Sequence, residues 1–410
     1  MPALPIPAPP LPRRALLRAG AAALAAPALA GAHDRAATQA GAAATPAADA
    51  PFPADTRLIL EGIADDALAA TYTPGALVGA WHPGRGSWRK AAGVGDLATG
   101  APVTLDDHVR IASNTKTFVG LVTLQLVDEG AIGLDDPLER YVPGVANGDA
   151  ITIRQVLGMS AGIHSYVDDP RIAVDYAADP LLPFTPDDAL AIVRAAAPDF
   201  APGERVQYSD SNYILLGFVV EGVTGRTLAE EIAARVIRPL GLAHTSFPDT
   251  VDMPTPYLHG YAAGAPGDPL IDASRSNPDV AWAAGAMVST LADLRVYVEA
   301  LATGALLSPR TFAAQTEFGS LASRPGMDVG YGLGLLSYNG LLGHNGGIVG
   351  YSSWMLHEPE SGATLVVVTN RSGIDGGTAD PIFAGIVRLL FPDRFPPIPQ
   401  TDPAAATPAP

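Results

Sequence analysis

Residues 113–122 read Ser-Asn-Thr-Lys-Thr-Phe-Val-Gly-Leu-Val, which places a serine three positions before a lysine at the head of an apolar run. If the run is a helix, positions i and i+3 lie on one face, so the Lys116 amine reaches the Ser113 hydroxyl. An arginine could not act as a base there, because a guanidinium stays protonated whereas a desolvated lysine can lose its proton. The chain has two lysines against 23 arginines, which indicates that a lysine is required at this position. The spacing is typical of serine hydrolases that form an acyl-enzyme.

The composition bounds the class of protein. A length of 410 residues with 48% hydrophobic content suits one large enzyme body or two subdomains with a sizeable core. The formal net charge of −17 argues against nucleic acid and anionic membrane surfaces as partners, since both bind basic patches. The chain has no cysteine, which excludes disulfides and thiol catalysis, and its eight histidines show no tight ligand spacing. We expect no metal and no cofactor, and the oligomeric state stays open.

The N-terminus has the pattern of an export signal. Residues 1–30 contain no acid, and Arg13, Arg14 and Arg18 precede a mild alanine and leucine run that ends in Ala-Leu-Ala. This pattern predicts a twin-arginine signal and an exported, periplasmic or secreted protein. The run is too short and too weakly apolar to span a membrane. Removal of residues 1–30 would delete these three arginines and take the net charge from −17 to −20.

The rest of the chain divides into a linker, one hydrolase domain and a tail. Residues 31–53 and 393–410, rich in alanine and proline, predict a disordered linker and tail around a domain at 54–392. Apolar periodicity predicts helices at 55–70, after 113, and at 152–157, 187–196, 211–223, 228–237 and 380–390. It predicts strands at 76–81, 88–94, 332–338, 349–356 and 363–369. The fold class is therefore α/β of the α+β kind: an antiparallel sheet flanked by the terminal helices, with a mostly helical insertion at about 130–275.

Two further motifs complete a family pattern. Residues 208–210 read Tyr-Ser-Asp, and residues 344–346 read His-Asn-Gly. With residues 113–116 and matching flanks at 151–157, 238–242, 285–294 and 331–334, the chain resembles the serine beta-lactamase-like and DD-peptidase superfamily over roughly residues 55–392. Its nearest branch holds class C beta-lactamases, D-alanyl-D-alanine carboxypeptidases and related esterases. The resemblance implies a beta-lactamase/transpeptidase-like fold and a small-molecule or peptide substrate.

The chemistry of the three catalytic candidates follows from the residue types. Ser113 at a helix start gains from the positive end of the helix dipole, which favours negative charge on the acyl oxygen. Lys116, partly buried beneath it, should have a depressed pKa and can orient or deprotonate the hydroxyl. Tyr208 next to a cation should have a lowered phenol pKa and can carry a proton to the leaving group. Which of Lys116 and Tyr208 is the base stays open.

The resemblance assigns the substrate-binding candidates. It implies that His344 has an electrostatic and hydrogen-bonding role, that Gly346 lets the substrate backbone approach, and that the Gly347 amide pairs with the Ser113 amide as an oxyanion hole. Asp210 stands where many relatives have asparagine, so a carboxylate near the amine could hold Lys116 as a cation or change substrate binding.

Two of these positions also bear on specificity. Asn345 and Gly347 stand where carboxypeptidases of this branch tend to carry hydroxyls that hold a substrate carboxylate. This departure weakens the case for carboxypeptidase activity, and it predicts that simple esters are cleaved more readily than D-Ala-D-Ala peptides or penicillins.

Residues 158–162, Gly-Met-Ser-Ala-Gly, also fit the nucleophile elbow of α/β-hydrolases. That elbow needs a strand before it and a helix after it, whereas 152–157 predicts a short helix and 163–170 a loop, so we reject Ser160 as the nucleophile. We expect an exported serine hydrolase that is acylated on Ser113 and is most like a D-alanyl-D-alanine carboxypeptidase acting on cell-wall peptides. The alternatives are an esterase or a beta-lactamase on the same site, or a non-catalytic penicillin-binding protein.

Overall fold

The computed structural model describes residues 50–176, 178–263, 268–324, 326–372 and 377–396. The expected export signal and most of the expected linker and tail therefore lie outside the described residues. The packed part extends slightly beyond the expected domain limits. Phe52 is buried and its amide donates to the Ser87 carbonyl oxygen, and Phe395 is buried and stacks on Tyr338.

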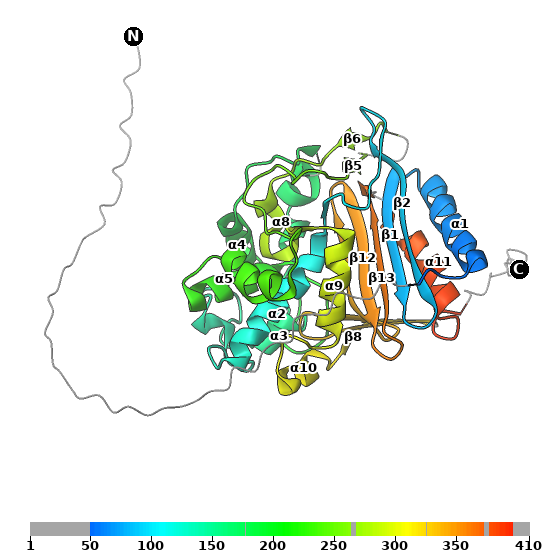
Figure 1. Cartoon of the computed structure of the whole chain (residues 1–410). Coiled ribbons are helices and arrows are strands. Elements are labelled where there is room, and N and C mark those ends of the chain that lie inside the picture. Colours follow the sequence, from blue (N-terminus) through cyan, green and yellow to red (C-terminus); the bar gives the residue numbers. More distant parts are fainter. Residues whose placement is uncertain (1–49, 177, 264–267, 325, 373–376, 397–410) are drawn as a thin grey trace, which may run out of the picture. The chain divides into compact units, whose positions relative to one another are not determined.

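A nine-stranded antiparallel sheet forms the centre of the described part of the chain, with the strand order β3-β2-β1-β13-β12-β11-β10-β9-β8 (Figure 1). Its strands are β1 (Gly75–His82), β2 (Gly86–Asp96), β3 (Ala101–Pro102), β8 (Gly319–Arg324), β9 (Met327–Tyr331), β10 (Leu336–Tyr338), β11 (Leu341–Ile348), β12 (Tyr351–Glu358) and β13 (Ala363–Thr369). Short strands outside this sheet are β4 (Val109–Arg110) with β7 (Val288–Ser289), and β5 (Tyr261–Ala262) with β6 (Ile271–Asp272) and β14 (Arg371–Ser372). The pairing of β1 with β13 joins the N-terminal hairpin to the last long strand, as the sequence predicted.

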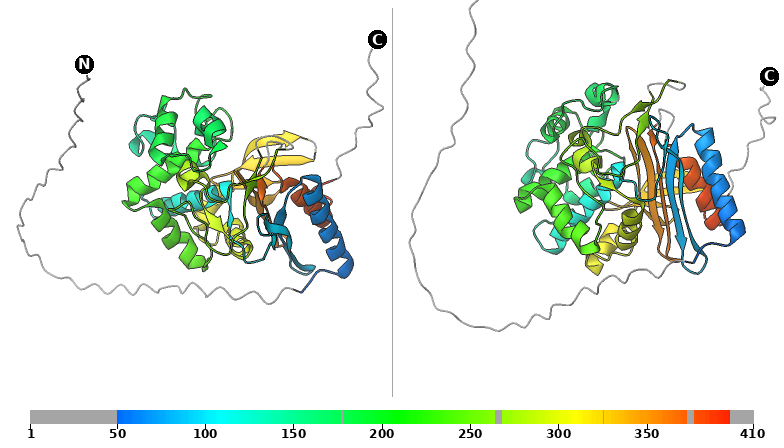
Figure 2. Two further views of the ribbon diagram at one scale, coloured as in Figure 1. Left: turned by 90° about the horizontal axis from the view of Figure 1, so that it is seen from above. Right: turned by 45° about the horizontal axis from the view of Figure 1, so that its top comes forward.

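Helices cover both faces of the sheet. They are α1 (Ala54–Ala70), α2 (Thr115–Asp128), α3 (Ile153–Leu157), α4 (Pro186–Ala195), α5 (Ser211–Thr224), α6 (Leu228–Ile232), α7 (Arg238–Leu240), α8 (Pro278–Gly285), α9 (Leu291–Ala302), α10 (Pro309–Gln315) and α11 (Asp380–Leu390). Figure 2 shows α1 in blue and α11 in red together on one face, and the helical region from α2 to α10 on the other. α9 packs on β12 and β13 from that second face. The expected fold class is therefore confirmed.

The helical region is longer than predicted. Helices α8, α9 and α10 continue it to Gln315, beyond the expected limit of about 275. The sequence carried their start signals, because Asn277, Thr290 and Ser308 each accept a hydrogen bond from an amide in the first turn of the helix that follows. A prediction from the hydrophobic pattern alone does not take these capping residues into account.

Two strands near the site begin and end differently from the prediction. The expected strand at 332–338 is a turn followed by β10, because Gly334 has a φ of +76° and the Gly332 amide donates back to the Leu335 carbonyl oxygen. The expected strand at 349–356 begins only at Tyr351, after Gly350 with a φ of +91°, and runs on to Glu358. A positive φ suits glycine and breaks the extended backbone, so each glycine marks a turn.

The edge of β11 matters most for the site. β12 pairs with β11 along residues 342–348, but β10 pairs only with Leu341–Gly343. Residues 344–348 therefore have no strand on their other side among the described residues, and the turn at Ala112–Asn114 packs against β11. An open strand edge offers backbone N–H and C=O groups to a bound molecule.

Candidate active site

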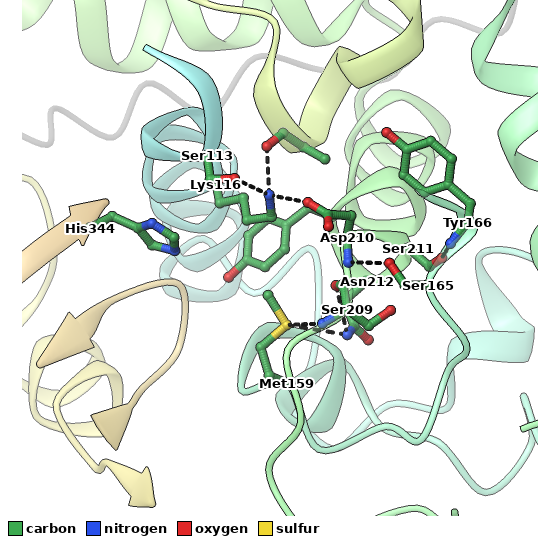
Figure 3. Close-up of polar contacts among 12 residues, drawn as sticks. Ser113, Lys116, Met159, Ser165, Tyr166, Ser209, Asp210, Ser211, Asn212 and His344 are labelled. Carbon is green, nitrogen blue, oxygen red and sulfur yellow. Dashed lines mark hydrogen bonds and ion pairs between the residues drawn. The ribbon is translucent and has the colours of Figure 1, made fainter. Parts of the chain in front are cut away.

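The three motifs meet on the face of the sheet that carries the helical region. Ser113 lies in a short 3₁₀ turn, Ala112–Asn114, which leads directly into α2, where Lys116 lies in the first turn. Asp210 immediately precedes α5, and His344 lies on β11. Figure 3 shows the Lys116 amine between Ser113 and Asp210, with His344 on the other side of Ser113.

The turn that carries Ser113 is held in an unusual conformation. Ala112 has a φ of +49°, which a residue with a side chain rarely adopts. The buried side chain of Asn114 donates from Nδ2 to the Ile111 carbonyl oxygen at 2.7 Å and to Ser353 Oγ on β12 at 2.8 Å. These bonds fix the serine turn to the sheet, which is how strained backbone at functional sites persists.

Lys116 uses all three of its potential donors. Its Nζ lies 2.9 Å from Ser113 Oγ, 2.6 Å from Asp210 Oδ1 and 2.7 Å from the Ala284 carbonyl oxygen. The side chain is fully buried, whereas a partly buried one was expected. Three acceptors around one nitrogen match a protonated ammonium, so Lys116 rests as a cation.

Burial makes that cation unstable. Desolvation lowers the pKa of Lys116 below its ordinary value, as predicted, and the charge and hydrogen bond of Asp210 partly oppose the shift. The ion pair with Asp210 fits the expectation that a carboxylate at this position would hold Lys116 as a cation. The amine is therefore placed to lose a proton more easily than a surface lysine.

The predicted direction of the Tyr208 shift is wrong. Burial, and then the negative charge of Asp210, raise the pKa of the Tyr208 phenol well above its ordinary value, and a hydrogen bond with Ser113 only partly opposes them. The Lys116 cation does face the ring, with Nζ 5.1 Å from its centroid. Desolvation of the phenolate outweighs that attraction, so Tyr208 stays a neutral proton donor.

His344 is neutral as well. Burial and the charge of Lys116 lower its pKa to about 3. Its Nδ1 lies 2.5 Å from the Asn345 carbonyl oxygen, which can only accept, so Nδ1 carries the proton. Its Nε2 lies 3.2 Å from the Tyr331 hydroxyl oxygen. The electrostatic role that the resemblance implied is therefore not that of a cation. His344 contributes hydrogen bonding and orientation.

Neighbouring residues of β11 lie on opposite faces of the sheet. Asn345 is paired with Trp354, whose ring stacks on Phe383 of α11, so the Asn345 side chain lies on the α11 face, away from His344. With Gly347, Ser352 and other residues it lines a cavity of about 320 Å³. The predicted contact of Asn345 and Gly347 with substrate stays a prediction.

Gly346 makes room for a neighbouring part of the fold. A Cβ at this position would lie 2.5 Å from the Ile111 carbonyl oxygen, 2.7 Å from Ser353 Oγ and 3.0 Å from the Ala112 Cβ. The missing side chain therefore leaves space for the turn that carries Ser113, and the expected approach of a substrate backbone stays a prediction. At Gly347 a Cβ would meet nothing within 4 Å, so the space next to the strand is open there.

The expected oxyanion hole is compatible with the backbone. The Ser113 amide donates no hydrogen bond to any described residue. In an antiparallel strand, alternate residues direct both N–H and C=O to the same edge, and the Asn345 carbonyl oxygen points to the edge where His344 binds it. Gly347, two residues on, directs its N–H to that same open edge.

Several residues that hold the site were not predicted. Buried Met159 accepts from the Ser209 amide and the Asn212 side chain through its sulfur, at 3.4 and 3.3 Å, and Ser165 Oγ accepts from the Asp210 amide at 3.2 Å. Figure 3 shows these contacts around residues 208–212. The acceptor Ala284 contributes only its backbone, which has no sequence signature. Met159 and Ser165 lie on the stretch around the rejected serine elbow, so that stretch supports the site.

Rejection of Ser160 as the nucleophile agrees with the local structure. Helix α3 precedes it and an irregular loop follows, whereas a nucleophile elbow has a strand before it and a helix after it. The residue before Ser160, Met159, has a φ of +58°. Among the described residues, Lys116, Tyr208 and His344 make no hydrogen bond to Ser160. The serine that contacts the Lys116 amine is Ser113.

Solved structures share the fold of the chain. A D-stereospecific amidohydrolase from Streptomyces sp. is 34% identical, with a TM-score of 0.71 over 80% of this chain and 97% of that one. The D-amino acid amidase of Ochrobactrum anthropi SV3 shares the fold, at 24% identity and a TM-score of 0.72 over 82% of this chain and 97% of that one. No helix among the described residues is long and apolar enough to cross a bilayer.

Curated relatives match over shorter stretches. Protein flp of Staphylococcus aureus is 30% identical over 201 residues, which are 48% of this chain and 39% of that protein. A putative D-alanyl-D-alanine carboxypeptidase of Escherichia coli is 35% identical over 143 residues, 33% of each. The chain thus spans less than half the length of these relatives. The Beta-lactamase family model matches residues 60–387, most of the chain. The chain therefore belongs to the beta-lactamase family, within the superfamily of serine beta-lactamases and DD-peptidases.

Proposed function

We propose that the protein is an amidohydrolase that is acylated on Ser113 and cleaves small amides of D-amino acids. The observation that carries the proposal is the charge of the site. Lys116 is fully buried with all its donors engaged, His344 is neutral, and the Asp210 side chain, 20% exposed, is the charged group of the three that reaches solvent. None of the hydrogen bonds or ion pairs of these described residues involves an arginine. A substrate carboxylate would find an anion there.

The pKa shifts favour one assignment of acid and base. Lys116 touches Ser113 Oγ and has a lowered pKa, so the neutral amine accepts the serine proton as Oγ bonds to the substrate carbonyl carbon. The amides of Ser113 and Gly347 stabilise the oxyanion. Tyr208 then gives its proton to the leaving nitrogen as the C–N bond breaks, and takes it back from Lys116. Water attacks the acyl-enzyme, and the same groups release Ser113.

The similarity to the Streptomyces amidohydrolase, over nearly its whole length, supports D-amides as the substrate class. The D-alanyl-D-alanine carboxypeptidase expected from the sequence remains the second candidate, because the Escherichia coli relative carries that putative activity and matches a third of the chain. An esterase and a beta-lactamase are the remaining alternatives for the same site. Export through the twin-arginine signal at 1–30 is part of the proposal, and it predicts that a variant with Arg13→Lys and Arg14→Lys stays in the cytoplasm in cell fractionation.

The test is a substrate panel with a covalent label. D-phenylalaninamide, its L enantiomer, a D-Ala-D-Ala peptide, nitrocefin and p-nitrophenyl acetate are compared by kcat/KM, with Ser113→Ala as the control for catalysis at this site. We expect the D-amide to be cleaved faster than the L-amide and the D-Ala-D-Ala peptide. A fluorophosphonate should label Ser113 alone. A label at Ser160, or a D-Ala-D-Ala peptide cleaved faster than the D-amide, would refute the proposal, and lack of any turnover would favour the non-catalytic penicillin-binding alternative.

A further inference from the structure

Asp210 has an oxygen that the fold does not use. Aspartate at the start of a helix normally caps it by accepting amides of the first turn, but this side chain makes no such bond to α5. Its Oδ1 turns to Lys116 instead, at 2.6 Å, and its Oδ2 makes no hydrogen bond to any described residue. Lys116 is buried on one side of the carboxylate, while the carboxylate itself is 20% exposed. The carboxylate therefore reaches solvent with one oxygen that no described residue binds.

That oxygen lies close to the reaction centre. The two contacts that share Lys116 Nζ, 2.9 Å to Ser113 Oγ and 2.6 Å to Asp210 Oδ1, put Oδ1 no farther than 5.5 Å from Ser113 Oγ, and the free oxygen is bonded to the same carboxyl carbon. In a reactive complex the carbonyl carbon lies about 3–3.5 Å from the attacking oxygen. The α-nitrogen of an amino acid amide is two covalent bonds from that carbon. An α-amino group on the acyl side can thus reach the carboxylate.

We propose that the free oxygen of Asp210 binds the α-ammonium group of the substrate, so that the enzyme selects D-amino acid amides and esters whose amino group is unblocked. This inference rests on the proposed function and names its substrate class. An ionised carboxylate only accepts hydrogen bonds, so it attracts an ammonium and repels the carbonyl oxygen of an N-acyl group. Tyr166 and Tyr331 also feel the charge of Asp210, but both are buried and uncharged. Neither therefore competes with a substrate ammonium for the carboxylate.

Binding of an ammonium at Asp210 has a consequence for catalysis. Lys116 is held as a cation by Asp210, and a second cation at the same carboxylate weakens that hold and repels the charge of Lys116. The bound substrate thus favours the neutral amine, which is the form that accepts the Ser113 proton. An N-acylated substrate has no such charge and leaves Lys116 in its resting form. The net charge of −17 also raises the local concentration of cationic substrates.

The experiment compares matched substrates in matched variants. D-phenylalanine p-nitroanilide and its N-acetyl derivative form one pair, and the methyl esters of D-phenylalanine and N-acetyl-D-phenylalanine form the second. We expect the wild type to prefer the unblocked member of each pair by about 10- to 100-fold in kcat/KM, the range of a charge-assisted bond. Asp210→Asn should reduce this ratio to near one. Any loss of rate through Lys116 affects both members and cancels in the ratio. Asp168→Asn is the matched control, because it removes one negative charge from an exposed side chain that makes no hydrogen bond in the described structure. This variant should keep the wild-type ratio of unblocked to blocked substrate.

A second measurement needs no variant. In the wild type, the ratio within each pair should fall as the pH rises through the α-amino pKa, at about 7.7–8.0 or somewhat below, because the unblocked substrate loses its charge. A wild type that cleaves both members equally, or a ratio that survives in Asp210→Asn, overturns the inference. If the ester pair shows the preference while neither anilide is cleaved, the Asp210 subsite is supported and the proposed amidase activity fails.

Discussion

Gly346 and Gly347 are adjacent on β11, yet alanine should have opposite effects at the two positions. At Gly346 the new Cβ would lie 2.5 Å from the Ile111 carbonyl oxygen and 2.7 Å from Ser353 Oγ. Ordinary contacts begin near 3.4 Å, so the serine turn or β11 must move by a substantial part of an ångström. Overpacking of this kind costs about 1–3 kcal/mol of stability. A displacement of about 1 Å at a nucleophile costs roughly 100-fold in rate.

The assay separates stability from positioning. Gly346→Ala should reduce kcat by about 100-fold while thermal unfolding shifts by only a few degrees, since the fault lies at one turn. Gly347→Ala, where no atom lies within 4 Å of the new Cβ and the amide N–H is kept, is the matched control and should retain most of its activity. Near-normal turnover in Gly346→Ala would show that the serine turn tolerates the side chain. A loss in Gly347→Ala equal to that in Gly346→Ala would place the substrate, and not the turn, against both glycines.

Three further outcomes test the catalytic assignments. Lys116→Arg keeps the charge but cannot accept a proton, so acylation of Ser113 by a fluorophosphonate and turnover should both be nearly abolished; rapid labelling would remove Lys116 as the base. Tyr208→Phe removes only the hydroxyl and should lower kcat by about 100-fold or more, with unchanged thermal stability, if Tyr208 is the proton donor. In Asp210→Asn the pKa of Lys116 should fall further, because burial then acts without the opposing charge, so the acidic limb of kcat/KM for a neutral ester moves to lower pH. The same shift makes the variant less stable than the wild type at pH values below the folded-state pKa of wild-type Lys116, and the two converge above that pKa; a stability gap that does not depend on pH contradicts this account.

The sequence predicted that Ser113 and Lys116 meet, because their contact depends on local spacing. The i and i+3 positions of Ser113 and Lys116 on one helix determine their contact, and the residue type limits Lys116 to a base or a cation. Periodicity placed α1, α5 and α11 within a few residues for the same reason. What spacing cannot give is the environment. The sign of the Tyr208 shift depends on burial by residues remote in sequence, and the space at Gly346 is taken by a turn more than two hundred residues earlier.

The motif also could not predict on which face of the sheet each side chain of β11 lies. His-Asn-Gly reads as one unit in the sequence, but a strand sends successive side chains to opposite faces. His344 therefore faces Tyr208 and Tyr331, while Asn345 lines the cavity on the α11 face.

Burial acts with opposite sign on the two groups that contact Ser113, and this difference assigns their roles. Removal from water disfavours the charged form of each, so it lowers the pKa of the Lys116 ammonium and raises the pKa of the Tyr208 phenol. Lys116 is more easily found as the neutral amine that can accept a proton, and Tyr208 keeps its proton more firmly, although both sit in one desolvated site. Asp210 resists the first shift and adds to the second, and its side chain is partly exposed to solvent. A ligand that neutralises Asp210 therefore moves Lys116 toward its reactive form, which is why a cationic substrate suits this site better than a carboxylate.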